Sequence, residues 1–218
     1  MPSSPSARTF AVRHLQMARA AFAALAALMI TFSPDHSAAV GLSVFSGFAI
    51  ATAVVLLIAA WLVYRADHRW PAVVLGVLTV LAGMAGGIVA WRSTTLFFVI
   101  VIAWALATGF FELLSGILAR RSGSEPRADA RDAIVVGAIT LILGVGLMLV
   151  PGGYALNYYI DEAHQTFTLT GIAIGVGVFG GYAAVIAVYL GIAAFSPRAK
   201  PTPAATAASG TPSEGDRG

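Results

Sequence analysis

The fold of this chain is decided by residues 70–121, which read WPAVVLGVLTVLAGMAGGIVAWRSTTLFFVIVIAWALATGFFELLSGILARR. Two long apolar segments, 71–91 and 93–119, flank a short polar step, and a pair of arginines closes the stretch. The first segment contains no charged residue, and the second contains one, Glu112. About 20 apolar residues, each rising 1.5 Å along a helix, cross a hydrocarbon core of roughly 30 Å. The stretch therefore predicts two membrane-spanning helices joined as a hairpin.

The composition also indicates burial in lipid. Only 11% of the residues are charged, 58% are hydrophobic and the mean hydropathy is +0.84, whereas a soluble domain has about 25% charged residues. The net charge of +3 does not indicate nucleic-acid binding, because the positive residues stand at the ends of apolar segments. The chain has no cysteine, which excludes disulfides and thiolate chemistry. The expected partner is the lipid bilayer.

Four further apolar segments lie on either side of the central hairpin. They are residues 15–33, 38–64, 133–150 and 166–195. The ends 1–13 and 197–218 are expected to be disordered tails. Within the first segment, the uncharged run 20–33 is only 14 residues long, which is also typical of a signal-peptide core, with Ser37-Ala38-Ala39 as a cleavage site. Reading it as a spanning helix instead requires Arg19 to extend its guanidinium to the headgroups.

Positive residues gather on one side of this predicted topology. Of the thirteen Lys and Arg residues, twelve fall in the tails and connections of one side or, as Arg19, beside it. The opposite connections contain Arg92 alone. The positive-inside rule places the arginine-rich side, with both termini, in the cytoplasm. Twelve arginines to one lysine, with many alanines and glycines, indicate a GC-rich bacterial genome, so we expect a multi-pass protein of the bacterial inner membrane.

Recurring spacings predict an internal repeat. Small residues stand seven apart in three spans: Ala20/Ala27, Gly76/Gly83 and Gly137/Gly144. Thr79 and Thr140 are in register within the last two pairs, and the other three spans end on arginines at 65, 120 and 198. We therefore expect an all-α bundle of six helices built from three parallel helical hairpins. Small residues let helices approach closely, and further candidates for such contacts are Gly87, Gly109, Gly171, Gly175, Gly177 and Gly181.

Glu112 is the sharpest candidate for function. An acidic residue at the centre of a spanning helix costs about 2.5–3.5 kcal/mol on insertion scales. It is therefore expected to have a buried partner, a proton or a water-filled cavity. Two interpretations follow: a proton-responsive or substrate-facing site, or a hydrogen bond that joins helices. The repeat equivalents of Glu112 are Leu57 and Leu190, so its role would be filled once per chain.

The connections opposite the arginine-rich side offer a second candidate. Asp35 and His36 lie in the first of them, and Asp161, Glu162 and His164 lie in the third. Imidazoles and carboxylates that meet could sense pH, although solvated loop residues are the ordinary alternative. We expect neither a resident metal nor a cofactor.

The segment IAWALATGFFELL (102–114), followed by Arg120-Arg121 and preceded by Trp70, Gly76 and Gly83, resembles the second hairpin of HdeD-like membrane proteins. The resemblance implies a small bacterial inner-membrane protein of six spans in three hairpins. It also implies a link to acid resistance, and it supplies no catalytic residue.

These features predict a non-enzymatic membrane protein, protective under acid or envelope stress. The alternative is a small-solute or proton-coupled transporter or channel that uses Glu112. A third interpretation is an assembly partner of another membrane protein, and a homo-oligomer stays open. Nucleotide-binding and nucleophile-elbow motifs are absent from the sequence.

The predicted topology has a direct test. Tags fused to the two ends should both be labelled from the cytoplasmic side only, because six spans return the chain to the side on which it began. Labelling of the two ends from opposite sides, or a mature protein that lacks residues 15–33, would contradict the six-span arrangement.

Overall fold

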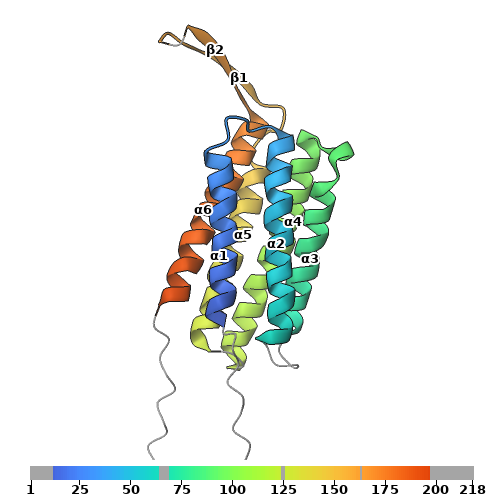
Figure 1. Cartoon of the computed structure of the whole chain (residues 1–218), viewed down its shortest axis with the longest axis vertical. Helices are drawn as coiled ribbons and strands as arrows, with labels where there is room; N and C mark the ends of the chain where they lie inside the picture. Colours follow the sequence, from blue (N-terminus) through green and yellow to red (C-terminus); the bar gives the residue numbers. More distant parts are fainter. Residues whose placement is uncertain (1–11, 64–68, 124–125, 163, 197–218) are drawn as a thin grey trace, which may run out of the picture.

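The computed structural model describes residues 12–63, 69–123, 126–162 and 164–196, which form a bundle of long helices with a β-hairpin at one end (Figure 1). In chain order the elements are α1 (Val12–Thr31), α2 (Ala38–Leu62), α3 (Trp70–Gly87), the short 3-10 helix η1 (Val89–Trp91), α4 (Thr94–Ser122), α5 (Arg127–Met148), β1 (Ala155–Ile160), β2 (Gln165–Thr170) and α6 (Gly171–Phe195). Six of these helices are long and apolar enough to cross a membrane. The predicted all-α membrane bundle is confirmed, and the chain is a multi-pass membrane protein.

The two ends of the bundle differ in chemistry. Helix α1 begins and α6 ends at the same end (Figure 1), where arginines also stand at the ends of α4 and α5. We call it the basic end, and the opposite one the hairpin end. At the hairpin end, Ser37, Ser93 and Thr170 cap the first turns of α2, α4 and α6 by accepting backbone N–H bonds. Such caps satisfy donors that the helix itself cannot.

Several helices extend beyond the apolar segments that predicted them. Helix α1 begins at Val12, α4 continues to Ser122 and α5 begins at Arg127, because charged and polar residues can continue a helix into the headgroup region and water. Helix α3 is shorter than predicted, since it ends at Gly87 and is followed by η1. Of the predicted tails, 1–11 and 197–218 lie outside the described residues, as does the second span's last residue, 64.

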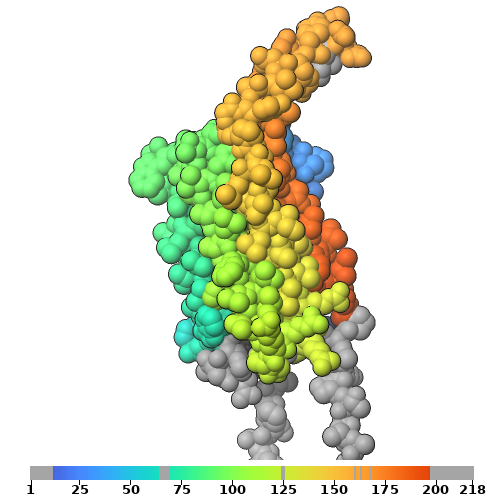
Figure 2. Space-filling model, turned by 180° about the vertical axis from the view of Figure 1, so that it is seen from behind, coloured from blue at the N-terminus to red at the C-terminus, as the bar shows by residue number. Residues whose placement is uncertain are grey.

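The expected start of the sixth span at residue 166 is wrong. Residues 165–170 form β2, which pairs antiparallel with β1, and α6 begins only at Gly171. In the register, Leu156 lies opposite Leu169 and Asn157 opposite Thr168. Apolar and polar pairs thus alternate, which favours a two-stranded ribbon over a helix. The hairpin projects beyond the helix ends (Figures 1 and 2).

The six spanning helices form a closed ring in chain order, because α1 packs against α6. The closest packing alternates around this ring: α2 lies tightly against α3, α4 against α5 and α6 against α1. The pairs α1–α2, α3–α4 and α5–α6, which are the predicted hairpins, touch less extensively. Three similar hairpins around one axis would produce such an alternation, and the internal repeat stays a prediction.

Glycines line the tight contacts. A Cβ on Gly109 would lie 2.8 Å from the backbone nitrogen of Leu141, and one on Gly137 would overlap the backbone of Leu113. Helix α3 lies on α2 in the same way at Gly76 and Gly83, where an added Cβ would come within 2.9 Å of a side chain. In a bilayer, such close approach supplies the van der Waals contact that holds helices together.

The remaining candidate glycines divide into two groups. A Cβ would come within 3.0 Å of a neighbour at Gly87, Gly144, Gly171 and Gly175. At Gly177 and Gly181, by contrast, nothing among the described residues lies within 4 Å of an added Cβ. Both are exposed, so they lie on the outward face of α6, and the close contact expected from their four-residue spacing is not made.

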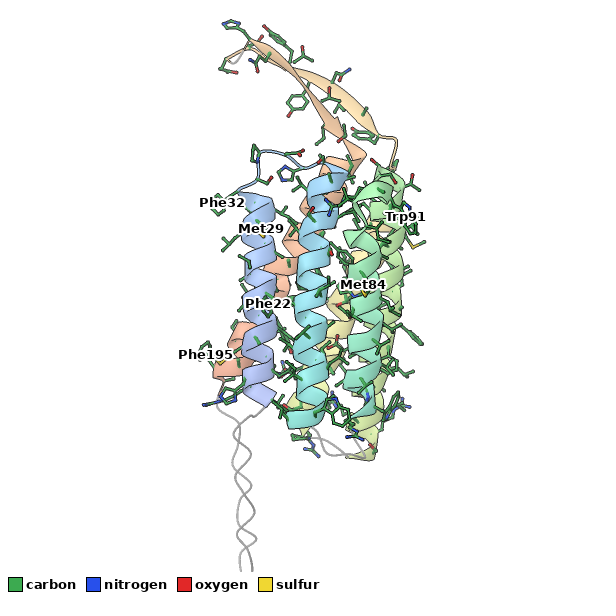
Figure 3. The ribbon with its side chains drawn as sticks, turned by 45° about the vertical axis from the view of Figure 1, so that its right-hand side comes forward. Phe22, Met29, Phe32, Met84, Trp91 and Phe195 are labelled. Carbon is green, nitrogen blue, oxygen red and sulfur yellow. The ribbon has the colours of Figure 1, made fainter. Side chains whose placement is uncertain are left out.

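The outer surface of the bundle is apolar. Met29, Phe32, Met84, Trp91 and Phe195 are all more than half exposed and point away from the helices (Figure 3). A soluble protein rarely leaves so many large apolar side chains uncovered. On this chain they form the lipid-facing surface.

An aromatic cluster fills the interior. Phe45 and Phe48 of α2 both make edge contacts with Trp104 of α4 and with Phe179 of α6, with ring centroids 5.2–6.0 Å apart. Tyr182 lies beside Trp104 and Phe179. The polar site described below begins on the side of this cluster that faces the basic end.

The glycine contacts predict a sharp positional effect. Replacing Gly137 with Ala should destabilise the protein by about 1–3 kcal/mol, because α4 and α5 must move apart to admit a methyl group. Thermal unfolding of the purified protein in detergent measures the change. Gly146→Ala is the matched control on the same helix, since an added Cβ there meets nothing within 4 Å in the described structure. Equal unfolding temperatures for the two variants would contradict the packing argument.

Candidate functional site

Glu112 lies inside the bundle. It is ten residues before Ser122, the last residue of α4, which places it about 15 Å along the helix from the basic end. Its side chain is 9% exposed. The acidic residue that the sequence singled out is therefore held between helices, away from the lipid-facing surface.

Arg19 of α1 is the partner of Glu112. Its Nη1 donates to Oε1 at 2.9 Å and its Nη2 to Oε2 at 3.4 Å. The expectation that Arg19 extends to the headgroups is wrong, because the Glu112 carboxylate offers the guanidinium a two-point, charge-assisted partner inside the bundle. A sequence signal for this pairing existed, since Arg19 is the one basic residue within any of the six predicted spans.

A second polar network ties three helices together nearer the basic end. Asp132 of α5 accepts a hydrogen bond from Gln16 Nε2 of α1 at 2.6 Å and another from the hydroxyl of Tyr189 of α6 at 3.0 Å. None of these three residues was a candidate from the sequence. Asp132 stands immediately before the predicted fifth span, so it resembled a surface residue that needs no partner.

Hydroxyl groups continue the polar site toward the aromatic cluster. Trp104 Nε1 donates to Thr79 Oγ1 at 3.3 Å. The hydroxyls of Thr140 and Tyr182 lie 3.0 Å apart. Thr79 and Thr140 are the two threonines that the sequence placed in register. Their partners, Trp104 and Tyr182, lie 78 residues apart, which is also the spacing between the arginines at 120 and 198 that follow their spans. Each of these two contacts joins the two helices of one predicted hairpin, α3 with α4 and α5 with α6.

Three cavities meet at the ion pair. The largest, about 190 Å³, lies toward the basic end and is lined by Arg19 and Glu112 together with Ser115 and Ser122. A second, of about 70 Å³, brings Asp129 and Asp132 to the same two charges. The third, of about 20 Å³, lies on the bundle axis and is lined in part by threonines. We call the largest one the vestibule and the smallest one the axial cavity.

The predicted repeat relates Glu112 to two leucines, and the structure places both of them in packed positions. Leu190 of α6 is 1% exposed and lines the 70 Å³ cavity beside Glu112. Leu57 of α2 packs over Gly76. Leucine thus fills positions related to Glu112 without leaving a polar group to satisfy, and α4 alone places a carboxylate there.

The candidates outside the bundle remain in two separate places. Asp35 organises the α1–α2 connection by accepting bonds from the backbone and hydroxyl of Ser37, both at 2.8 Å, and His36 follows it. Asp161, Glu162 and His164 lie at the tip of the β-hairpin, beyond the helix ends (Figure 1). Within the described ranges, no group of three His, Asp or Glu side chains could hold a metal ion. Their pH-sensing role stays a prediction.

Comparisons with known proteins do not assign this chain to a family. The chain matches no family model, no curated protein and no solved structure. The function has to be argued from the site itself.

The ion pair predicts a non-additive effect on stability. Arg19→Leu and Glu112→Leu should each destabilise the protein by about 3–5 kcal/mol, because each leaves one buried charge without its partner. The double variant should regain most of that loss, since it removes both charges and restores an apolar layer. Unfolding of the four proteins in one detergent forms the double-mutant cycle. Additive losses would mean that the two side chains do not stabilise each other.

Proposed function

We propose that this protein carries a small solute or protons across the membrane, with the Arg19–Glu112 pair as the group that responds to the substrate. The supporting observation is the position of the pair, which is buried between helices and yet lines the vestibule. The sequence alone favoured a protective role over transport. A cavity that reaches Glu112 is the feature that favours transport.

Stability alone is a poor explanation for such a pair. A buried ion pair is often no more stabilising than well-packed apolar residues of similar volume. Leu190, at the position of α6 that the predicted repeat relates to Glu112, is buried, which supports the idea that an apolar side chain can pack there. Ionisable residues within a membrane interior are expensive and commonly mark the pathways of ions and substrates.

The size of the vestibule limits the substrate. A cavity of about 190 Å³ is smaller than pockets for drug-sized ligands, which begin at about 300 Å³. Protons, or a solute of a few heavy atoms, are the substrates that this space favours. Protonation of Glu112 would remove its charge and free the Arg19 guanidinium, so binding of a proton would change the contact between α1 and α4. The pair requires no bond-making chemistry, and the protein is proposed to be non-enzymatic.

Flux measurements test this proposal. Liposomes that contain the purified protein should dissipate an imposed proton gradient, or take up a small solute, faster than empty liposomes. Glu112→Gln should abolish the difference, because the amide cannot titrate or form the same ion pair. Glu112→Asp is the matched control, since it keeps a titratable carboxylate at the same position and should retain part of the flux. Equal flux for Glu112→Gln and the unaltered protein, or no flux in either, would overturn the proposal.

A second candidate function rests on the resemblance of residues 70–121 to HdeD-like proteins. It is protection of a bacterium under acid or envelope stress, from the inner membrane and with the basic end in the cytoplasm. The arginines that gather at the basic end support that orientation through the positive-inside rule. Cells that lack the gene should then survive acid less well than cells that have it. Restored survival with the Glu112→Gln protein would mean that protection does not need the ion pair. Equal survival with and without the gene would remove this candidate.

A further inference from the structure

The axial cavity contains a polar group that no other part of the structure accounts for. All six spanning helices contribute to its lining, and from α2 it receives Thr52. Thr52 is 5% exposed, and its hydroxyl oxygen has no hydrogen-bonding partner among the residues that the structure describes. Hydroxyls buried in this way are rare, because a serine or threonine in a spanning helix usually bonds to a neighbouring helix or to its own backbone.

The other hydroxyls around this cavity do have partners. Thr108 donates to the backbone oxygen of Trp104 at 2.6 Å, and Thr140 donates to that of Val136 at 2.8 Å. Each of these threonine oxygens still keeps a lone pair that can accept a bond. The cavity therefore presents Thr52 as a free donor and acceptor, with further acceptors nearby.

The volume and lining of the cavity suit one water molecule. A cavity needs roughly 10–15 Å³ to hold a water, and that water needs two to four polar partners. The axial cavity measures about 20 Å³, and its polar lining includes Thr52, Thr79, Thr108 and the Arg19–Glu112 pair. An apolar cavity of this size would stay dry, whereas these polar side chains favour occupancy by water.

We propose that the axial cavity binds a single water molecule, held by the hydroxyl of Thr52 beside the Arg19–Glu112 pair. Four residues line both the axial cavity and the vestibule: Arg19, Leu56, Leu75 and Glu112. These residues form a layer between the two spaces. Glu112 thus has the vestibule on its basic-end side and, in this proposal, a water on the side of the aromatic cluster.

This arrangement deepens the proposed function, on which the following step rests. A carboxylate that lines both the vestibule and the proposed water site can exchange a proton with water on either side, so the proton is the favoured transported or coupled species. The charged and titratable groups that line cavities with Glu112 are Arg19 from α1, Asp129 and Asp132 from α5 and Tyr182 from α6. Helices α2 and α3 bring no charged side chain to these cavities in the described part of the chain.

Water-edited solid-state NMR of the protein in lipid bilayers tests the water site directly. Magnetisation from water should reach the methyl groups of Thr52, Thr79 and Thr108 rapidly, although none of the three lines the vestibule. Val176, which is fully buried outside these cavities, is the dry reference. The transfer to Thr79 and Thr108 should be lost in Thr52→Val and kept in Thr52→Ser. If the Thr52 methyl is as slow as Val176 in the unaltered protein, the cavity is dry and the proposal fails.

Thermal unfolding gives an independent test, because the direction in which Thr52→Val shifts the unfolding temperature differs between a hydrated and a dry cavity. If Thr52 holds a water, Thr52→Val removes that hydrogen bond and should lower the unfolding temperature. If the cavity is dry, the same change removes an unsatisfied hydroxyl and should raise the temperature. Ser43→Ala, which removes an exposed hydroxyl from the same helix, corrects for the loss of a hydroxyl as such.

Flux separates this inference from the function on which it rests. In proton-loaded liposomes, Thr52→Ser should conduct like the unaltered protein and Thr52→Val about tenfold less, because the hydrogen-bonded relay is broken. If Glu112→Gln loses flux and Thr52→Val keeps normal flux, the proposed transport function is supported. The proposed role of the water in proton exchange is then overturned. If no protein variant conducts, the carrier proposal fails, and the NMR and unfolding results still decide whether the water is bound.

Discussion

Lipid offers no hydrogen bonds to a protein, and this constraint accounts for most of the structure. Each segment that crosses the membrane has to satisfy its own backbone, so all six are helices. The polar side chains on those helices turn inward for the same reason, where Arg19 meets Glu112 and Trp104 meets Thr79. The outer surface keeps large apolar side chains such as Phe32 and Trp91.

The same constraint explains why glycine carries much of the packing. Lipid chains are as apolar as leucine, so burying an apolar side chain between helices gains little over leaving it in the bilayer. Close approach of backbones supplies the attraction instead. Gly109 and Gly137 allow α4 to lie directly on α5, and Gly76 and Gly83 do the same for α3 on α2.

The candidate site is a local exception to an otherwise apolar and regular interior. Leu190 occupies the position in α6 that the predicted repeat relates to Glu112 in α4, and it is buried. Well-packed apolar residues of similar volume are often as stabilising as a buried ion pair. The chain places two opposite charges there. The ion pair thereby separates the vestibule from the axial cavity with a carboxylate that can bind a proton, which is why the proposed function is placed in this layer rather than in the loops.

The amino-acid sequence alone determined the number of spans, the end of the bundle at which the positive residues gather, and the small residues available for close packing. These properties follow from segment length, from arginine position and from helical period, which are all local. It also identified Glu112, because an acid within an apolar segment is costly wherever it lies. The β-hairpin was missed, because the residues up to 165 were expected to form a connection and residue 166 to begin the sixth span. The pairing of 155–160 with 165–170 is seen only in the structure.

Only the tertiary structure decided what Glu112 contacts. Arg19 lies 93 positions away on a helix that is not adjacent to α4 in the ring, and Thr52 has no partner in the described structure for reasons that its own segment does not reveal. The helical period reports which residues share a face of one helix. Which other face they meet depends on how all six helices pack together, and no spacing along a single segment contains that information.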